Sequence, residues 1–192
     1  MGHSASLIIL DRDGVLNQTL YNPHEARPDS PLCVEDVVVF SWVPRLLRQL
    51  TEAGYTLAVA SNQPASAKGK VSLDTLRKVH ERVLAEAQRE GGVISSSHLC
   101  FHRSEDGCAC RKPKGGLLLE ALALHSACLK EQSWMVGDRA TDVLAGVAVG
   151  VQTALIADTN GAEGRVLVAS SVQPSFCGGD LQDFGRFLLA GE

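Results

Sequence analysis

The sequence predicts one α/β domain built on a parallel β-sheet with helices on its faces. Short apolar runs alternate with segments that carry apolar residues at helical spacing, which is the pattern of repeated βα units. The chain has 192 residues, of which 45% are hydrophobic and 21% are charged, so it can bury a sizeable core. No internal repeat, low-complexity tract or interdomain linker divides residues 1–192, and we therefore expect a single domain.

Four short apolar runs predict buried strands. They are Leu7–Leu10, Thr56–Ala60, Trp134–Val136 and Thr153–Ile156. The helices predicted between and after them are Val43–Ala53, Asp74–Gln88, Leu117–Leu124 and Thr141–Val147. Gly54 is suited to end the first helix, and Ser72 is suited to cap the start of the second. Residues beyond Asn160 give only weak signals before Leu181–Leu189.

Two predicted loops are long, Asn17–Glu35 after the first strand and Ser95–Gly116 in the middle of the chain. Long loops in compact α/β domains usually carry function. No large cap domain fits between Ser61 and Trp134, because helices and the second loop fill that interval. We therefore expect substrate specificity to come from loops.

The bulk composition argues against several classes of partner. A net charge of −4 and the lack of a basic, aromatic strip argue against nucleic acid. No run of about 18 apolar residues is present, so we expect no membrane span. The N-terminus lacks the charged-then-apolar layout of a signal peptide. We expect a cytoplasmic monomer whose six cysteines stay reduced.

Polar side chains follow three of the predicted strands where each strand ends. Asp11-Arg12-Asp13-Gly14 follows the first, Ser61-Asn62-Gln63 the second and Gly137-Asp138 the third. Ligands bind beyond the carboxyl ends of strands in open parallel sheets, so we expect the three clusters to meet at one edge. Turn formation or helix capping would explain any one cluster alone. Three in order, with the basic pair Arg111-Lys112 between the second and third, favour one active site.

These residue types are the ones that phosphoryl transfer needs. A carboxylate such as Asp11 attacks phosphorus and forms an aspartyl-phosphate, which divides hydrolysis into two easier steps. Two anions need a bridging Mg²⁺, for which Asp11 and Asp138 offer oxygen ligands. Asp13 is suited to protonate the leaving oxygen and then to activate water. Ser61 offers a hydrogen bond to a phosphoryl oxygen, and Lys112 offers positive charge.

At these positions the chain resembles the haloacid dehalogenase (HAD) superfamily of phosphatases, over roughly Leu7 to Ile156. Residues 11–16 match its first motif, Ser61 and Asn62 its second, Lys112 its third and residues 137–142 its acidic fourth. The resemblance implies a Rossmann-like core with no large cap domain.

The resemblance also implies roles for the acidic residues. Asp11 would be the nucleophile and Asp13 the acid and base. Mg²⁺ would be held by the Asp11 carboxylate, the Asp13 backbone carbonyl and Asp138. Asp142 would reach the metal through water or brace the loop. The alternative for Asp142 is a first-turn residue that the helix dipole favours.

A second group of residues has the spacing of a structural zinc site. Its C-x-H-x5-C-x-C pattern consists of Cys100, His102, Cys108 and Cys110. Three thiolates and one imidazole complete a tetrahedral site with no open position, and they suit Zn²⁺ better than Mg²⁺ or Ca²⁺. The alternative is a set of incidental reduced thiols, but residues 103–107 are polar and offer no core to bury thiols. We expect the zinc to hold the loop at residues 95–116 in one shape.

The zinc loop leads directly into Arg111-Lys112-Pro113. This order is similar to the zinc-bearing branch of the superfamily, which contains D-glycero-D-manno-heptose-1,7-bisphosphate 7-phosphatases and histidinol-phosphate phosphatases. Residues 11–17 and Ser61-Asn62-Gln63 resemble that branch as well. The resemblance implies that Arg111 contacts the non-reacting part of the substrate and Lys112 the transferred phosphoryl group. We also assign Asn62, Gln63 and Arg139 to the substrate site.

The chain departs from that branch in the loop after Gln63. The branch usually reads Ser-Gly-Ile-Ala-Arg-Gly there, whereas this chain has Pro64-Ala65-Ser66-Ala67-Lys68-Gly69. Pro64 removes a backbone N–H, and Lys68 replaces a bidentate guanidinium with a point charge. These changes leave the chemical residues in place and bear on the identity of the substrate.

We expect a small phosphate ester as substrate, with the 7-phosphate of a heptose bisphosphate of carbohydrate metabolism first. Histidinol phosphate or another sugar phosphate is the alternative within the branch. A nucleic-acid-end phosphatase is disfavoured by the acidic net charge. A zinc-stapled binding module without catalysis would be marked by loss of Asp11, Asp13, Lys112 or Asp138, and all four are present.

Overall fold

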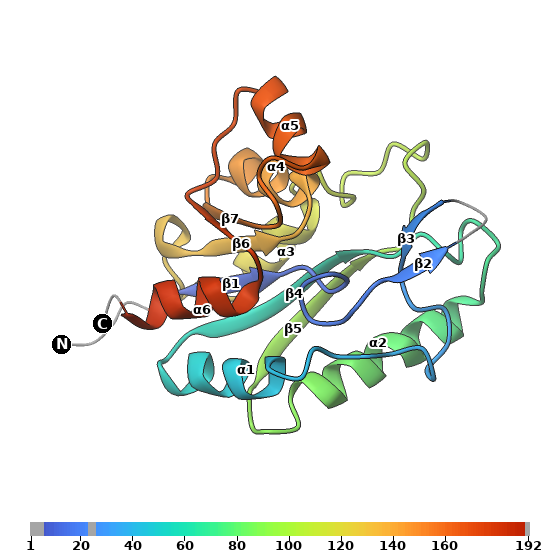
Figure 1. The fold of residues 1–192 in the computed structure, drawn as a ribbon, viewed down its shortest axis with the longest axis horizontal. Coiled ribbons are helices and arrows are strands. Elements are labelled where there is room, and N and C mark those ends of the chain that lie inside the picture. Colours follow the sequence, from blue (N-terminus) through green and yellow to red (C-terminus); the bar gives the residue numbers. More distant parts are fainter. Residues whose placement is uncertain (1–5, 23–25, 191–192) are drawn as a thin grey trace.

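The three-dimensional structure is a computed structural model that describes residues 6–22 and 26–190. Within those residues, six strands form one parallel sheet in the order β5-β4-β1-β6-β7-β8 (Figure 1). Their bounds are β1 (Leu7–Leu10), β4 (Thr56–Asn62), β5 (Ile94–Cys100), β6 (Trp134–Gly137), β7 (Gln152–Ile156) and β8 (Phe176–Gly178). A separate antiparallel hairpin pairs β2 (Leu20–Asn22) with β3 (Arg27–Asp29).

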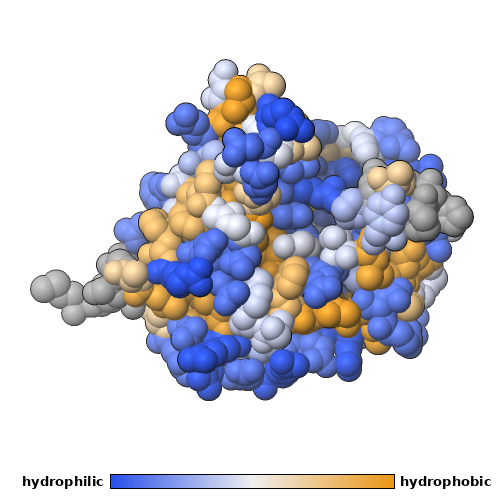
Figure 2. All heavy atoms as spheres, in the orientation of Figure 1, coloured by the Kyte–Doolittle hydropathy of each residue, from blue (hydrophilic) through white to orange (hydrophobic). Residues whose placement is uncertain are grey.

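Helices cover both faces of the sheet and make three layers. The helices on one face are α1 (Val43–Glu52), α2 (Leu73–Ala87) and α6 (Leu181–Ala190). Those on the other face are α3 (Gly116–Leu124), α4 (Ala140–Val149) and α5 (Ala162–Ala169). A short 3₁₀ helix, η1 (Lys130–Gln132), precedes β6. Figure 2 shows that hydrophilic residues cover most of the face seen in Figure 1, with hydrophobic residues among them.

The central strand β1 explains why its sequence is apolar at every position. Ile8 and Leu10 pack into the core beneath α1, α2 and α6, whereas Leu7 and Ile9 pack into the core beneath α3 and α4. All four side chains are fully buried. A strand covered on both faces has no exposed side, so its sequence does not alternate with polar residues.

The order of the strands fixes where a ligand binds. The chain runs outward from β1 through β4 to β5, then returns to place β6 on the other side of β1. The connections therefore diverge at the carboxyl end of β1, which is the topological switch point of an open α/β sheet. Asp11 follows β1 directly, and its amide donates to the carbonyl of Val136 on β6 at 2.9 Å.

The predicted fold class is confirmed, and each predicted strand and helix is present with boundaries shifted by a few residues. Three parts of the prediction are wrong. The segment Ser95–Gly116 is not all loop, since its beginning belongs to the edge strand β5. The segment Asn17–Glu35 contains the β2–β3 hairpin, and the weak tail contains α5 and β8.

Among the described residues, no helix has both the length and the apolar character needed to cross a membrane.

One buried polar residue lies beneath the first catalytic motif. His80 on α2 is 7% exposed, and neither of its ring nitrogens has a hydrogen-bond partner among the described residues. Burial and the nearby positive charge of Arg12 lower the pKa of His80 to about 4. The imidazole is therefore neutral in the folded protein at neutral pH.

The low pKa of His80 predicts that stability falls as the pH is lowered. The unfolded imidazole has a pKa of 6.5 and the folded one about 4, so between these values the unfolded chain binds the proton more readily. At about 1.4 kcal/mol per pKa unit, the free energy of unfolding loses at most about 3 kcal/mol from this group. Urea unfolding at about pH 7 and about pH 5 measures the loss. The His80→Leu variant should lose less stability over this range, and an equal loss in both proteins would contradict the assignment.

Candidate active site and zinc centre

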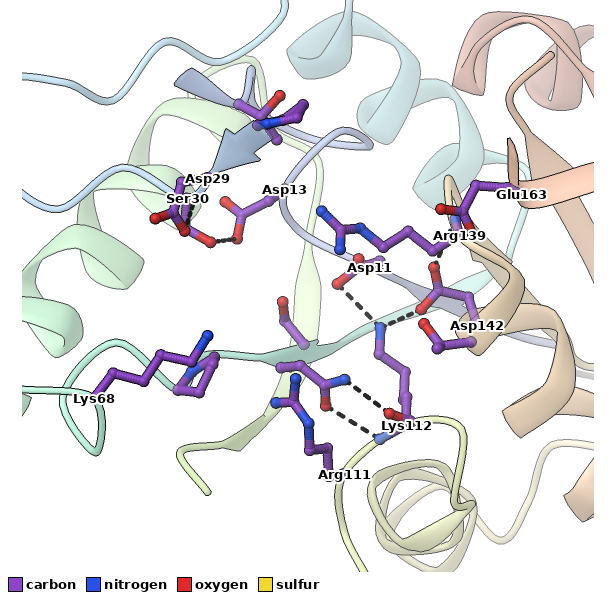
Figure 3. Close-up of a pocket in the computed structure, with 16 residues that line it drawn as sticks. Asp11, Asp13, Asp29, Ser30, Lys68, Arg111, Lys112, Arg139, Asp142 and Glu163 are labelled. Carbon is purple, nitrogen blue, oxygen red and sulfur yellow. Dashed lines mark hydrogen bonds and ion pairs between the residues drawn. The ribbon is translucent and has the colours of Figure 1, made fainter. Parts of the chain in front are cut away.

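A pocket of about 230 Å³ lies at the carboxyl ends of β1, β4 and β6 (Figure 3). It is lined by the four predicted catalytic residues, Asp11, Asp13, Ser61 and Lys112. Three of the residues predicted to bind substrate, Asn62, Arg111 and Arg139, line it as well. The structure thus brings together side chains from four widely separated parts of the chain.

Lys112 lies between two carboxylates at the floor of the pocket. Its Nζ is 3.1 Å from Asp11 Oδ1 and 2.6 Å from Asp142 Oδ1, and it donates to the carbonyl of Ala60 at 2.7 Å. Burial opposes the charge on this lysine, but Asp11 and Asp142 together raise its pKa, so the ammonium is retained. Asp142 also accepts a hydrogen bond from the amide of Arg139 at 3.0 Å. Asp142 therefore braces both Lys112 and the turn after β6.

The site carries more negative charge than Lys112 neutralises. One carboxylate oxygen from each of Asp11, Asp138 and Asp142 lies within 4.8 Å of the others. Asp138 Oδ1 is buried without a hydrogen-bond partner among the described residues. Burial and the charges of Asp11 and Asp142 raise the pKa of Asp138 to about 8. An unpartnered carboxylate oxygen beside two further carboxylates fits a hard divalent cation, which takes oxygen ligands.

Gly14 allows this arrangement. Its φ of +84° is a left-handed conformation that glycine adopts without steric cost. A Cβ atom at this position would lie 2.3 Å from Asp138 Oδ2. The turn after β1 can therefore approach the Asp138 carboxylate only with glycine here.

Asp13 is the most heavily hydrogen-bonded carboxylate of the site. Arg12 donates through Nε at 3.1 Å and Nη2 at 3.0 Å, and side chains at positions 17, 30 and 63 donate at 2.9, 2.8 and 2.6 Å. Burial opposes ionisation, but the charge of Arg12 and these donors together lower the pKa of Asp13. The resting carboxylate is therefore ionised, as a base must be. Nearby negative charge from a phosphate ester would oppose this shift and favour the acid form.

Two residues predicted to bind substrate have different contacts. Gln63 is 1% exposed and donates to Asp13 Oδ2 and Ser61 Oγ, so it holds these two side chains from a buried position. The amide of Asn62 pairs with the backbone of Lys112, donating to its carbonyl at 3.0 Å and accepting from its N–H at 3.1 Å. Asn62 therefore positions Lys112, even though it borders the pocket.

The sequence did not predict the contacts that four residues make in the site. Arg12 and Asn17 contact Asp13, Ser30 does so from beyond the hairpin, and Glu163 accepts a hydrogen bond from the amide of Ala140 at 2.8 Å. Arg12 and Asn17 are one and four positions from Asp13 in the sequence, so their contacts with Asp13 could have been predicted from this short separation. Ser30 and Glu163 lie in segments whose folds were not predicted.

The four predicted zinc ligands converge as their spacing predicts. The Sγ of Cys110 lies 3.3 Å from Cys100 Sγ, 3.4 Å from Cys108 Sγ and 3.3 Å from His102 Nδ1. Cys100 Sγ lies 3.7 Å from Cys108 Sγ. A tetrahedral zinc with bonds of about 2.3 Å needs ligand separations of about 3.8 Å. Burial and the neighbouring sulfurs raise the pKa of Cys110 to about 12, so a cation is needed to hold these thiolates together.

The fold and the site define a HAD-like hydrolase. Residues 109–184 match a protein-family model described as HAD-hydrolase-like. The chain is 39% identical over 155 residues to a D-glycero-β-D-manno-heptose-1,7-bisphosphate 7-phosphatase of Pseudomonas putida, covering 78% of this chain and 81% of that one. A Neisseria meningitidis enzyme of the same name is 35% identical over 150 residues, covering 78% and 76%. The chain belongs to the family of these 7-phosphatases within the HAD-like hydrolases.

A solved structure supports the same assignment. The D,D-heptose 1,7-bisphosphate phosphatase from B. bronchiseptica, complexed with magnesium and phosphate, superposes with a TM-score of 0.79 at 28% identity. The match covers 97% of this chain and 99% of that chain. The predicted superfamily, its zinc-bearing branch and the class of enzyme, a HAD-type phosphatase, are confirmed.

The crowding of carboxylates predicts an effect of Asp138→Asn on stability. Without a divalent cation and above about pH 8, where Asp138 is ionised, the variant should melt several degrees higher than the wild-type protein, because it removes a buried negative charge from beside Asp11 and Asp142. Added Mg²⁺ should raise the melting temperature of the wild type and leave that of the variant unchanged. Thermal melts with EDTA and with Mg²⁺ measure both effects. A variant that Mg²⁺ stabilises as much as the wild type would remove Asp138 from the cation site.

The zinc geometry predicts separate losses of metal and of loop order. Cys108→Ser should lose zinc, which elemental analysis should find at about one per wild-type chain. The sheet should stay folded, because the core beneath α1, α2 and α6 contains no residue of this loop and Cys108 is only partly buried against the core on the other face. Residues 101–115 should become sensitive to protease. Both kcat and KM should worsen, since Lys112 and Arg111 follow the last ligand directly. Matched digestion of Cys33→Ser provides the control, and a zinc-free variant with normal kinetics would contradict a positioning role.

Proposed function

We propose that this protein is a Mg²⁺-dependent phosphatase that removes the 7-phosphate of D-glycero-β-D-manno-heptose 1,7-bisphosphate. One observation carries the proposal: Asp11, Asp13 and Lys112 line a pocket that is bordered by Lys68, Arg111 and Arg139, and Asp138 lies beside Asp11. The relatives named for this reaction supply the identity of the substrate.

In the first step, a carboxylate oxygen of Asp11 attacks the phosphorus atom. The bond between phosphorus and the ester oxygen breaks, and Asp13 gives a proton to the leaving oxygen. Lys112 Nζ, already 3.1 Å from Asp11 Oδ1, stabilises the negative charge on the transferring group. The Oγ of Ser61 is free to donate to a phosphoryl oxygen, because it accepts a hydrogen bond from Gln63.

In the second step, the Asp13 carboxylate takes a proton from water, and the water oxygen attacks the phosphorus of the aspartyl-phosphate. The bond to Asp11 breaks, inorganic phosphate leaves, and Asp13 is again protonated for the next cycle. A Mg²⁺ held by Asp11, the Asp13 carbonyl and Asp138 would neutralise charge on the phosphoryl oxygens and on Asp11.

The border of the pocket favours a second phosphate on the substrate. Lys68, Arg111 and Arg139 bring three positive charges. Of the two acidic residues nearby, Asp29 is already paired with Lys70 at 2.6 Å, and Glu163 accepts the Ala140 N–H. An anionic group on the non-reacting end is stabilised there, whereas the ammonium of histidinol phosphate is not.

We further propose that the enzyme acts in the cytoplasm as a monomer, on a small-molecule phosphate ester rather than on nucleic acid. The cluster of three cysteines and one histidine requires reduced thiols, which the cytoplasm maintains.

Steady-state kinetics on a panel of esters tests the substrate. We expect the highest kcat/KM for the heptose 1,7-bisphosphate, with histidinol phosphate and heptose 7-phosphate at least about tenfold lower, or about 1.4 kcal/mol. Arg111→Met should lower kcat/KM for the bisphosphate by about tenfold and reduce its advantage over the monophosphate. Asp11→Asn, which keeps the shape without the nucleophile, is the control for contaminating phosphatases. A preference for histidinol phosphate would overturn the proposed substrate and leave the chemistry intact.

A further inference from the structure

The β2–β3 hairpin stands apart from the main sheet and reaches the active site. Leu20 pairs with Asp29, and Tyr21 pairs with Pro28, so the hairpin delivers the next residue, Ser30, to the pocket. The Oγ of Ser30 donates to Asp13 Oδ2 at 2.8 Å (Figure 3). A segment with no strand in the sheet thus contacts the residue proposed as acid and base.

Ser30 differs in position from the other donors to Asp13. Among the described residues, Arg12, Asn17 and Gln63 also donate to this carboxylate, and all three are at most 1% exposed and do not line the pocket. Ser30 lines the pocket instead. It is therefore the donor on the side from which the leaving oxygen of a substrate approaches.

An ion pair holds Ser30 in place. Asp29 Oδ1 accepts the Ser30 N–H at 3.0 Å, and Asp29 Oδ2 is 2.6 Å from Lys70 Nζ. Asn22 on β2 donates to the same Asp29 oxygen at 3.2 Å. The Asp29 and Lys70 side chains are only 23% and 20% exposed, so solvent screens this pair less than it screens a surface pair.

The ion pair joins two parts of the pocket wall. Lys70 lies at the end of the loop that follows β4 and Ser61, whereas Asp29 belongs to the hairpin that follows β1. The ammonium also neutralises a second carboxylate in the pocket, which would otherwise repel an anionic ester.

We propose that Ser30 is a positioning residue for Asp13 and that the Asp29–Lys70 ion pair holds it there. The inference rests on the proposed role of Asp13 as acid and base. Ser30 fixes the direction of Asp13 Oδ2 on the substrate side, so that its proton meets the leaving oxygen. Arg12 Nη2 and Gln63 Nε2 also donate to Oδ2, at 3.0 and 2.6 Å. Neither side chain lines the pocket, so Ser30 supplies the contact on the substrate side.

The choice of leaving group separates this role from general structural support. An alkoxide, such as that left by a sugar phosphate, needs the proton of Asp13, whereas p-nitrophenolate leaves without one. Ser30→Ala should lower kcat/KM for the heptose bisphosphate by about tenfold and change that for p-nitrophenyl phosphate by less than about threefold. Ser30→Thr keeps the hydroxyl and should restore the loss.

The ion pair is tested with the same two esters. Lys70→Met should reproduce the selective loss in part, and Lys70→Arg should restore activity by keeping the positive charge. Lys78→Met is the matched control, because it removes an exposed ion pair with Asp74 on α2 and should change neither rate. Thermal melts of every variant identify any that fail to fold. If Ser30→Ala does not fold, Ser30→Thr is the variant whose rates on the two esters test the role of the hydroxyl group.

Three outcomes decide the inference. A selective loss on the sugar ester in Ser30→Ala, restored in Ser30→Thr, supports it. Equal losses on both esters, or no loss on either, overturn it. Asp13→Asn is measured alongside, and it should show the same selectivity in a stronger form. If Asp13→Asn shows no dependence on the leaving group, the proposed acid role of Asp13 fails, which is a different result from failure at Ser30.

Discussion

The architecture of the active site depends on one buried lysine shared between carboxylates. Lys112 holds Asp11 and Asp142 at 3.1 and 2.6 Å, and Asp138 lies within the same small volume. Such a group of like charges is costly unless cations are placed among it. The surrounding turns bring these carboxylates and Lys112 close together. Gly14 and Gly137 allow the turns to approach, since a Cβ on either would meet a carboxylate oxygen at 2.3 or 2.1 Å.

A zinc ion would fix the segment that carries Lys112, and a magnesium ion would lie beside Lys112 in the active site. Lys112 lies between β5 and α3, where no helix or strand fixes the chain. The cysteine and histidine ligands just before it replace the missing core, and Asn62 holds the Lys112 backbone from the opposite side. Arg111 is tied to the same loop through the carbonyl of His102 at 3.2 Å. The soft ligands would thus hold the loop in shape and the hard oxygen ligands would hold the catalytic cation, and the difference in ligand type would keep the two ions in separate sites.

The sequence predicted the centre of the fold better than its edges. The strand Leu7–Leu10 was evident because burial on both faces makes it continuously apolar, and the aspartates follow it in a fixed spacing. The edge strand β5 was missed, because its Ser-rich sequence and half-exposed face lack that signal. The contacts of Gln63 with Asp13 and of Asn62 with the Lys112 backbone were not predicted, because sequence does not say which side of a strand end meets the ligand. Ser30 had no signal at all, since a hairpin brings it to Asp13 from 17 positions away.

The proposed mechanism requires that Asp11 carries the phosphoryl group during turnover. Acid quenching of the enzyme with its substrate and Mg²⁺, followed by borohydride reduction, converts a phosphorylated aspartate to homoserine, which peptide mass spectrometry locates. We expect homoserine at position 11 in the wild-type protein and none in Asp11→Asn. Asp13→Asn should give a larger amount with p-nitrophenyl phosphate, which needs no proton to form the intermediate that this variant does not hydrolyse. Homoserine at position 13 or 138, or an unmodified Asp11 under turnover, would contradict the proposed mechanism.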